Sequence, residues 1–150
     1  MPAVLLDTNL LILLIVGTAD RSYIIKHKRL RAYTEDDFNL LLRIIAPMSP
    51  IIVTPNILTE ASNLASQIAE PARTHIAMTF RAVLGEIEER YVASRRAVEQ
   101  PEFPRLWLTD AGILDEMTDS HVLLTADLGL YLAALERGHE AVNFTYSREL

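Results

Sequence analysis

Residues 3–9 read Ala-Val-Leu-Leu-Asp-Thr-Asn, and this stretch decides the fold class. Its four apolar residues form the short continuous run that is typical of a strand buried on both faces of a parallel sheet. The polar residues that follow, Asp7, Thr8 and Asn9, favour a turn or the N-cap of a helix. Because the apolar run from Leu10 to Val16 predicts a buried helix, a strand-to-helix unit is expected here.

The rest of the chain repeats this alternation. Further strands are expected at Ile51–Val53, His121–Thr125 and Glu140–Phe144. Helices are expected at residues 35–45 with Thr34 as N-cap, at Pro55–Ile68 with Thr54 as N-cap, and at Pro71–Tyr91, Thr109–Met117 and Asp127–Arg137. Strands that alternate with helices predict an α/β fold, with a mostly parallel sheet flanked by helices on both faces. A length of 150 residues is typical of one domain, so a single domain over residues 1–150 is expected.

Composition excludes several kinds of site. The chain has no cysteine, which rules out disulfides, cysteine-ligated zinc and a thiol nucleophile. The apolar run from Leu10 to Val16 is far too short to span a bilayer. No Lys or Arg precedes that run, as one would in a signal peptide. We therefore expect the run to be core, with no membrane association and a cytoplasmic location.

The charge distribution is uneven. A net charge of −6 argues against a general nucleic-acid binder, which should have a basic surface. However, a basic stretch lies between Arg21 and Arg31, and it contains Lys26, Lys28 and Arg29. This basic stretch has two interpretations: a solvated helix face, or a patch at the mouth of the site in which Lys26, Lys28, Arg29 and Arg31 contact substrate phosphates.

The aromatic residues offer candidates for contacts with bases. Tyr23 and Tyr33 flank the basic residues and are available for base stacking. Trp107 lies between Leu106 and Leu108, and this apolar setting predicts that it belongs to the core rather than to a stacking surface.

Four acidic residues follow the pattern of a site at the edge of the sheet. Asp7 and Asp127 follow predicted strands, Glu60 lies in the helix after the second strand, and Asp110 opens a helix before the third. Ligands bind at the carboxyl ends of parallel strands, so these side chains are expected to converge. Converging carboxylates repel one another, and Mg²⁺ or Mn²⁺ is their natural partner. The alternative is structural: N-caps for Asp7 and Asp110, a turn position for Asp127 and a solvated helix position for Glu60.

Four motifs that carry these acids resemble those of the PIN-domain family, which includes the VapC-like toxins of toxin–antitoxin modules. They are Val4-Leu5-Leu6-Asp7-Thr8-Asn9, Thr54-Pro55-Asn56-Ile57-Leu58-Thr59-Glu60, Leu108-Thr109-Asp110-Ala111-Gly112-Ile113-Leu114 and Val122-Leu123-Leu124-Thr125-Ala126-Asp127. The motifs occur in the order of the family and extend over nearly the whole chain. The order of four motifs is a more specific signal than a lone Asp-Thr-Asn.

The resemblance implies a three-layer, Rossmann-like PIN fold and a Mg²⁺- or Mn²⁺-dependent endoribonuclease. Such an enzyme hydrolyses single-stranded RNA by attack of metal-activated water and leaves a 5′-phosphate and a 3′-hydroxyl. By the same resemblance, Asp7, Glu60, Asp110 and Asp127 are the catalytic and metal-binding acids, and Thr8, Asn9 and Thr125 are supporting polar residues. It also implies a homodimer and, if the protein is a toxin, an antitoxin partner.

The sequence departs from the family pattern in one respect. The segment between Asp7 and Glu60 is longer than in compact VapC-like toxins, and the added length includes the basic stretch. This departure bears on substrate choice and on the toxin role more than on the fold. Asp115, which lies five residues after Asp110, is a further candidate ligand.

Two other functional classes remain as alternatives. One is a catalytically inactive PIN-like module that binds RNA or protein; the intact set of acids argues against it. The other is a different acidic-pocket protein, such as a phosphatase or a phospho-acceptor domain, but Asp7-Thr8-Asn9 lacks the second Asp of a haloacid-dehalogenase-type phosphatase. The sequence contains no recognisable catalytic triad motif and no Gly-rich phosphate loop.

Overall fold

A computed structural model describes residues 1–149 and contains one all-parallel sheet with the strand order β3-β2-β1-β4-β5. The strands in this part of the chain are β1 (Ala3–Leu6), β2 (Ile51–Val53), β3 (Glu88–Glu89), β4 (His121–Thr125) and β5 (Glu140–Asn143). The helices are α1 (Thr8–Ala19), α2 (Tyr23–Lys26), α3 (Glu35–Ile45), α4 (Pro55–Ala65), α5 (Ala72–Leu84), α6 (Ser94–Val98), α7 (Phe103–Glu116), α8 (Leu128–Glu136) and α9 (Phe144–Arg148), with a 3-10 helix η1 (Lys28–Leu30).

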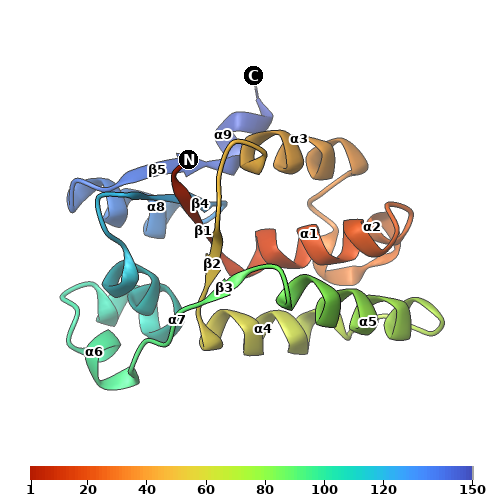
Figure 1. The fold of residues 1–150 in the computed structure, drawn as a ribbon, viewed down its shortest axis with the longest axis horizontal. Helices are drawn as coiled ribbons and strands as arrows, with labels where there is room; N and C mark the ends of the chain where they lie inside the picture. The colour runs from red at the N-terminus through yellow and green to blue at the C-terminus, as the bar shows by residue number, and fades with distance from the viewer. Residues whose placement is uncertain (150) are drawn as a thin grey trace.

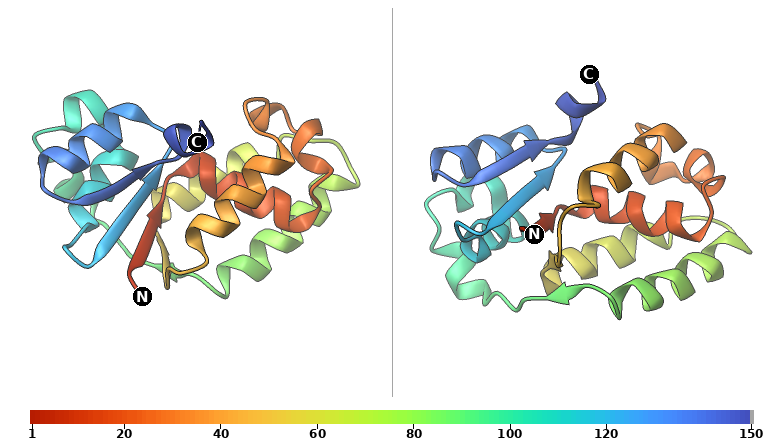
Figure 2. Two further views of the ribbon diagram at one scale, coloured as in Figure 1. Left: turned by 90° about the horizontal axis from the view of Figure 1, so that it is seen from above. Right: turned by 45° about the horizontal axis from the view of Figure 1, so that its top comes forward.

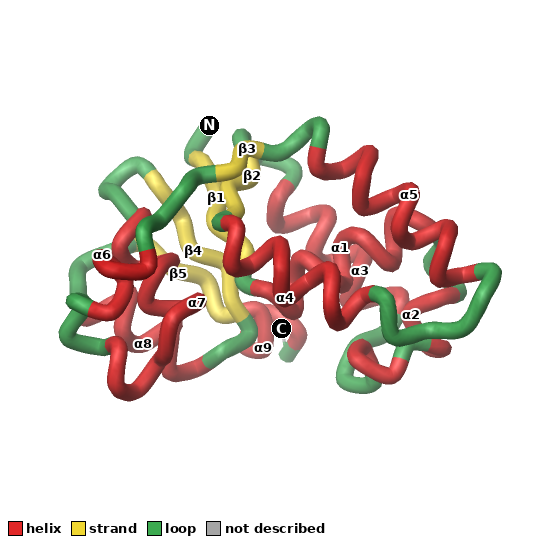
Figure 3. Tube along the Cα trace, turned by 90° about the horizontal axis from the view of Figure 1, so that it is seen from below, coloured by secondary structure: helices red, strands yellow, loops and turns green. Residues whose placement is uncertain are grey.

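The sheet lies between two groups of helices. Helices α1 to α5 gather on one side of it, and α6, α7 and α8 gather on the other (Figures 1 and 3). The view from above separates the same two groups (Figure 2). This arrangement follows from right-handed crossovers, because the chain moves outward from β1 through β2 to β3 and in the opposite direction from β4 to β5. The expected three-layer α/β class is therefore confirmed.

The strand order creates a switch point between β1 and β4. Strand β1 pairs with β2 through Val4 and Ile51, and with β4 through Leu6 and Leu124. The connections that leave β1 and β4 at their carboxyl ends lead to opposite faces of the sheet. In open α/β sheets a crevice forms at this position and binds ligands. The residues that follow Leu6 and Leu124 are therefore the first candidates for a functional site.

Helix α1 is the centre of the larger helical layer. Every residue from Leu10 to Val16 is buried, because α3, α4 and α5 all pack against this helix. A helix that is apolar on all sides is stable only when it is covered in this way. Gly17 permits the close approach of α3, since a Cβ atom at this position would lie 2.2 Å from a ring carbon of Phe38. None of the helices in residues 1–149 has the length and apolar character needed to cross a membrane.

The segment between α4 and α7 differs from its prediction. The helix expected over Pro71–Tyr91 ends at Leu84, and the strand β3 follows it at Glu88–Glu89. This edge strand consists of two charged residues, which form neither an apolar run nor an alternation of apolar and polar residues. The strand could therefore not be predicted from the sequence pattern. Charge on an edge strand also discourages pairing with other chains. Helix α6 likewise lies in a stretch for which the sequence predicted neither a helix nor a strand.

Candidate active site

Asp7 occupies the switch point and is held from both of its sides. It caps the N-terminus of α1, where its Oδ1 accepts a hydrogen bond of 3.0 Å from the backbone N–H of Leu10. Its Oδ2 accepts a hydrogen bond from the hydroxyl of Thr125 and one of 2.9 Å from the N–H of Ala126. Only 6% of Asp7 is exposed. These contacts fix the carboxylate between the start of α1 and the end of β4.

Asp127 is placed beside Asp7 by the same threonine. Its backbone N–H donates a hydrogen bond of 3.0 Å to Oγ1 of Thr125, whose hydroxyl in turn donates to Asp7. The Asp127 carboxylate caps α8 by accepting a bond of 2.9 Å from the N–H of Leu130. The predicted supporting role of Thr125 therefore has a structural basis, since its side chain joins the two acids that follow β1 and β4.

Glu60 reaches the site from α4. Thr54 caps this helix and Pro55 occupies its first turn, as the sequence predicts. The hydroxyl of Thr8 donates a hydrogen bond of 3.2 Å to Oε1 of Glu60, and the hydroxyl of Thr109 donates to Oε2. Glu60 thus connects α4 with the first turn of α1 and with α7, although α4 and α7 belong to opposite groups of helices.

Asp110 completes the acidic group from α7. Burial, and to a smaller extent the negative charges of Asp127, Asp7 and Glu60, together raise the pKa of its carboxyl to about 7. The other three acids predicted from the sequence therefore lie close enough to Asp110 for their charges to influence it. The ion pairs found in residues 1–149 involve Arg90, Arg96, Arg137 and Arg148, and none includes any of these four acids. We call Asp7, Glu60, Asp110 and Asp127 the acidic group.

The pKa of Asp7 is also raised. Burial is the largest cause, and the hydrogen bonds from Thr125, Leu10 and Ala126 oppose it by stabilising the charged form. The charge of Asp127 adds to the rise. In the described residues, no three His, Asp or Glu side chains are arranged as a ready-made metal shell. The structure therefore shows an acidic group with unbalanced negative charge, and metal binding by these residues stays a prediction.

The other predicted polar positions differ in their surroundings. Thr8 contacts Glu60, as described above, whereas Asn9 is exposed on the first turn of α1. Asp115 makes its contacts with other residues than the acidic group. Its carboxylate forms an ion pair of 3.1 Å with Arg96 and accepts a hydrogen bond of 3.0 Å from the side chain of Gln100. These two contacts give Asp115 a structural role on α7, in place of the role as a further ligand that was considered from the sequence.

The basic stretch lies away from the acidic group. It follows α1, whose 12 residues extend over about 18 Å from Asp7 at 1.5 Å per residue. At that end, a ring nitrogen of His27 lies 2.9 Å from the carbonyl oxygen of Ala65, and Arg29 donates to Gln67. His27 and Arg29 are therefore held against the end of α4, and for this part of the stretch the solvated-face interpretation fits better than a patch at the mouth of the site. The four cations predicted to contact substrate are exposed there: Lys26, Lys28, Arg29 and Arg31.

A pocket of about 520 Å³ opens beside the acidic group. Its lining comes from α4 and α7 and consists of Asn56, Thr59, Glu60, Leu106, Trp107, Leu108, Thr109 and Asp110. Trp107, which the sequence placed in the core, is 69% exposed, so that prediction is wrong. Sequence reasoning also missed Thr109 as the partner of Glu60, although its position directly before Asp110 was the available signal.

Comparisons of the chain with protein-family models, with curated proteins and with solved structures find no significant match. The resemblance to the PIN-domain family consequently rests on the four sequence motifs. The convergence of the acids that those motifs carry is an independent property of the fold.

Proposed function

We propose that this protein is a Mg²⁺- or Mn²⁺-dependent endoribonuclease that hydrolyses phosphodiester bonds of single-stranded RNA. One observation carries the proposal: Asp7, Glu60, Asp110 and Asp127 converge at the switch point of a parallel sheet, and none of the ion pairs within residues 1–149 includes them. Asp7 is buried and Asp110 is partly buried, whereas Glu60 and Asp127 are exposed. Carboxylates removed from water without a cationic partner are costly, so the placement of Asp7 and Asp110 is more readily explained by a function than by stability.

The donor atoms of the acidic group fit a hard divalent cation. All four side chains offer carboxylate oxygens, the ligands that Mg²⁺ and Mn²⁺ prefer. Burial is the largest cause of the raised pKa of Asp110, and the repulsion from the other acids adds to it. A bound cation would offset both effects. When bound, the metal supplies Lewis-acid chemistry that lowers the pKa of water and stabilises negative charge on a phosphate.

The remaining residues of the site orient the acids. Thr125 holds the Asp7 carboxylate and the backbone of Asp127 in one arrangement. Thr8 and Thr109 hold opposite oxygens of Glu60. Hydroxyl donors of this kind fix the direction of a carboxylate, and positioning accounts for much of the rate enhancement in phosphoryl chemistry.

The biological setting is part of the proposal. The character of the apolar run from Leu10 to Val16 suggests a protein that acts in the cytoplasm. By the family resemblance, it forms a homodimer and, as a toxin, is neutralised by an antitoxin. An acidic group open to a pocket of about 520 Å³ suits occupation by a basic side chain of such a partner. The exposed cations of the basic stretch are available for phosphates of the RNA away from the cleaved bond.

An inactive PIN-like binding module is the second candidate. It is favoured by one observation: Asp7 and Asp127 both cap helices, a structural role that requires no metal. On this interpretation the fold keeps the aspartates for α1 and α8, and the pocket binds RNA or protein without cleavage.

The deciding experiment is cleavage of end-labelled single-stranded RNA with Mg²⁺, Mn²⁺ or EDTA. Wild-type protein is expected to cleave only with metal, and Asp7→Asn and Asp110→Asn should abolish cleavage while circular dichroism shows a folded protein. Asn retains the N-cap acceptor of Asp7, which protects α1 in the variant. Asp119→Asn, at an exposed position after α7, is the matched control and should retain activity. Wild-type rates in both site variants would reject the site, and absence of cleavage with either metal would favour the binding module.

A further inference from the structure

Trp107 has a backbone conformation that side chains rarely adopt. Its φ of 65° and ψ of −166° interrupt α7 between the turn that starts at Phe103 and the longer part that carries Asp110. This region of conformational space is occupied almost only by glycine, because a Cβ atom causes steric strain there. Trp107 is the one non-glycine residue with positive φ in residues 1–149. Strain of this kind persists where the surrounding structure enforces it, and it gathers at functional sites.

The consequence of this conformation is an exposed indole beside the acidic group. Trp107 is 69% exposed although it lies between two leucines, and it lines the same pocket as Glu60 and Asp110. Phe103 packs against the indole in an edge-on arrangement, with ring centroids 5.7 Å apart. The kink thus turns a large apolar side chain toward solvent and braces it with a second aromatic ring.

The tyrosines considered for base stacking are engaged in other contacts, although Tyr33 lies near enough to Asp7 that burial and then the charge of this carboxylate raise the pKa of its hydroxyl. The hydroxyl oxygen of Tyr23 lies 3.1 Å from a ring nitrogen of His75, and the two rings pack edge-on. Tyr33 is covered by the guanidinium of Arg148, 5.4 Å from the ring centroid. By contrast, Trp107 combines exposure with a place in the pocket of the acidic group.

We infer that Trp107 is a stacking platform for one nucleobase of the bound RNA, next to the phosphate that the acidic group receives. The inference rests on the proposed function, since it takes RNA as the occupant of the pocket. Tryptophan presents the largest aromatic face of any side chain, and base stacking on such faces is the common way of holding single strands. Asn56 and Thr59 line the same pocket and supply hydrogen-bond donors and acceptors for the edge of a base.

In this arrangement, two surfaces of the site have different roles. The acidic group acts on the phosphodiester, whereas Trp107 fixes the adjacent base and so places the scissile bond. Stacking requires an unpaired base, because both faces of a base in a duplex are already covered by its neighbours. Trp107 therefore provides a physical reason for a preference for single-stranded over double-stranded RNA.

The test uses Trp107 as its own reporter, because it is the sole tryptophan of the chain. In the Asp7→Asn protein, which keeps the pocket but should not cleave, a short single-stranded RNA oligonucleotide is expected to quench the tryptophan fluorescence. A series of oligonucleotides, each with a single abasic site at a different position, should then be tested. Quenching should be lost for the oligonucleotide whose abasic site replaces the stacked base. Unchanged fluorescence, or equal quenching by a fully abasic oligonucleotide, would overturn the inference.

Kinetics supply the second measurement. Trp107→Ala should raise KM for single-stranded RNA by about five-fold to a hundred-fold with little change in kcat, and Trp107→Phe should restore much of the loss. Tyr91→Ala is the control, since Tyr91 is 81% exposed and does not line the pocket. An unchanged KM in Trp107→Ala would reject the stacking role while leaving the nuclease intact. Quenching by RNA without any metal-dependent cleavage would reject the nuclease and retain the stacking surface.

Discussion

Thr125 donates a hydrogen bond from its hydroxyl to Oδ2 of Asp7, across the boundary between β4 and β1. The two residues are 118 positions apart in the sequence, yet they meet at the switch point. Asp7 directly follows β1, and Thr125 is the last residue of β4, which pairs with β1. The same hydroxyl oxygen accepts the backbone N–H of Asp127. One buried threonine therefore sets the relative position of two members of the acidic group.

Thr125→Val is expected to shift the pH dependence of cleavage to higher pH. The hydrogen bond from Thr125 lowers the pKa of Asp7, so its loss raises that pKa and delays formation of the charged carboxylate. We expect roughly a ten-fold loss of activity near neutral pH, the usual effect of removing a group that orients a metal ligand. The measurement is the pH–rate profile with saturating Mg²⁺. Thr125→Ser keeps the hydroxyl and should resemble the wild type; a superimposable profile for Thr125→Val would contradict the assigned role.

Asp110 should make the metal-free protein less stable as the pH rises. Its pKa is about 7 in the folded protein and 3.8 for an ordinary aspartate, so between these values the folded state holds a proton that the unfolded state releases. The free energy of unfolding should therefore fall between about pH 4 and pH 7, by roughly 2 kcal/mol once solvent screening is allowed for. Urea unfolding in EDTA at several pH values measures this change.

Two variants isolate the contribution of Asp110 to this pH dependence of stability. Asp110→Asn cannot ionise, so its unfolding free energy should vary less with pH than that of the wild type, whereas Asp119→Asn should follow the wild type. Added Mg²⁺ should stabilise the wild-type protein more above pH 7 than below it, because protons compete with the cation for the carboxylate. The same pH slope in Asp110→Asn and wild type would refute the elevated pKa.

Substitutions at Trp107 should reveal the backbone strain. Gly is normally less favourable than Ala in a folded chain, but the order reverses where φ is positive. Trp107→Gly should therefore be more stable than Trp107→Ala by about 1 kcal/mol, since both variants lose the same indole contacts. Chemical denaturation of the two variants provides the comparison. An Ala variant as stable as the Gly variant would show that the conformation at this position carries no strain.

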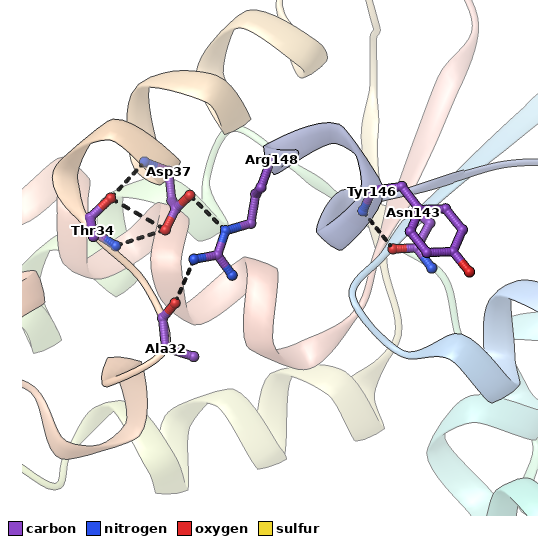
Figure 4. Close-up of polar contacts among 6 residues, drawn as sticks. All are labelled: Ala32, Thr34, Asp37, Asn143, Tyr146 and Arg148. Atoms are coloured by element: carbon purple, nitrogen blue, oxygen red, sulfur yellow. Dashed lines mark hydrogen bonds and ion pairs between the residues drawn. The ribbon is translucent and has the colours of Figure 1, made fainter. Parts of the chain in front are cut away.

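Asp37 should contribute more to stability than its neighbours in the first turn of α3. Its carboxylate accepts 2.8 Å hydrogen bonds from the N–H of Thr34 and from Arg148, whose guanidinium also donates to the carbonyl of Ala32 (Figure 4). Asp37→Ala removes the capping box and one half of a shielded ion pair, so we expect a loss of about 2 kcal/mol.

The matched control for this variant is Asp36→Ala, one residue earlier in the same turn. Asp36 is exposed, and its substitution should cost less than about 0.5 kcal/mol. Thermal or urea unfolding of both variants gives the comparison. Equal losses would mean that the link between α3 and α9 adds little to the general effect of an acid at a helix N-terminus.

Much of the site could be predicted because parallel strands share an edge. The apolar runs identify β1, β2 and β4, and the residue that follows each run must lie at the carboxyl edge of the sheet. This rule alone brings Asp7 and Asp127 together without any knowledge of their contacts. The caps of α3 and α4 were equally predictable, since a Thr before a helical run acts through bonds within one turn.

The sequence by itself thus determined the α/β class, the order of β1, β2, β4 and β5, and the set of acids that the fold collects, because these depend on local periodicity and on chain direction. Only the tertiary structure decided that the basic stretch packs at the far end of α1, that Asp115 binds Arg96, and that Trp107 is exposed. Each of these outcomes depends on a partner or a kink that no local pattern encodes. For Trp107, two flanking leucines indicate burial, and a single positive φ turns the indole toward the solvent instead.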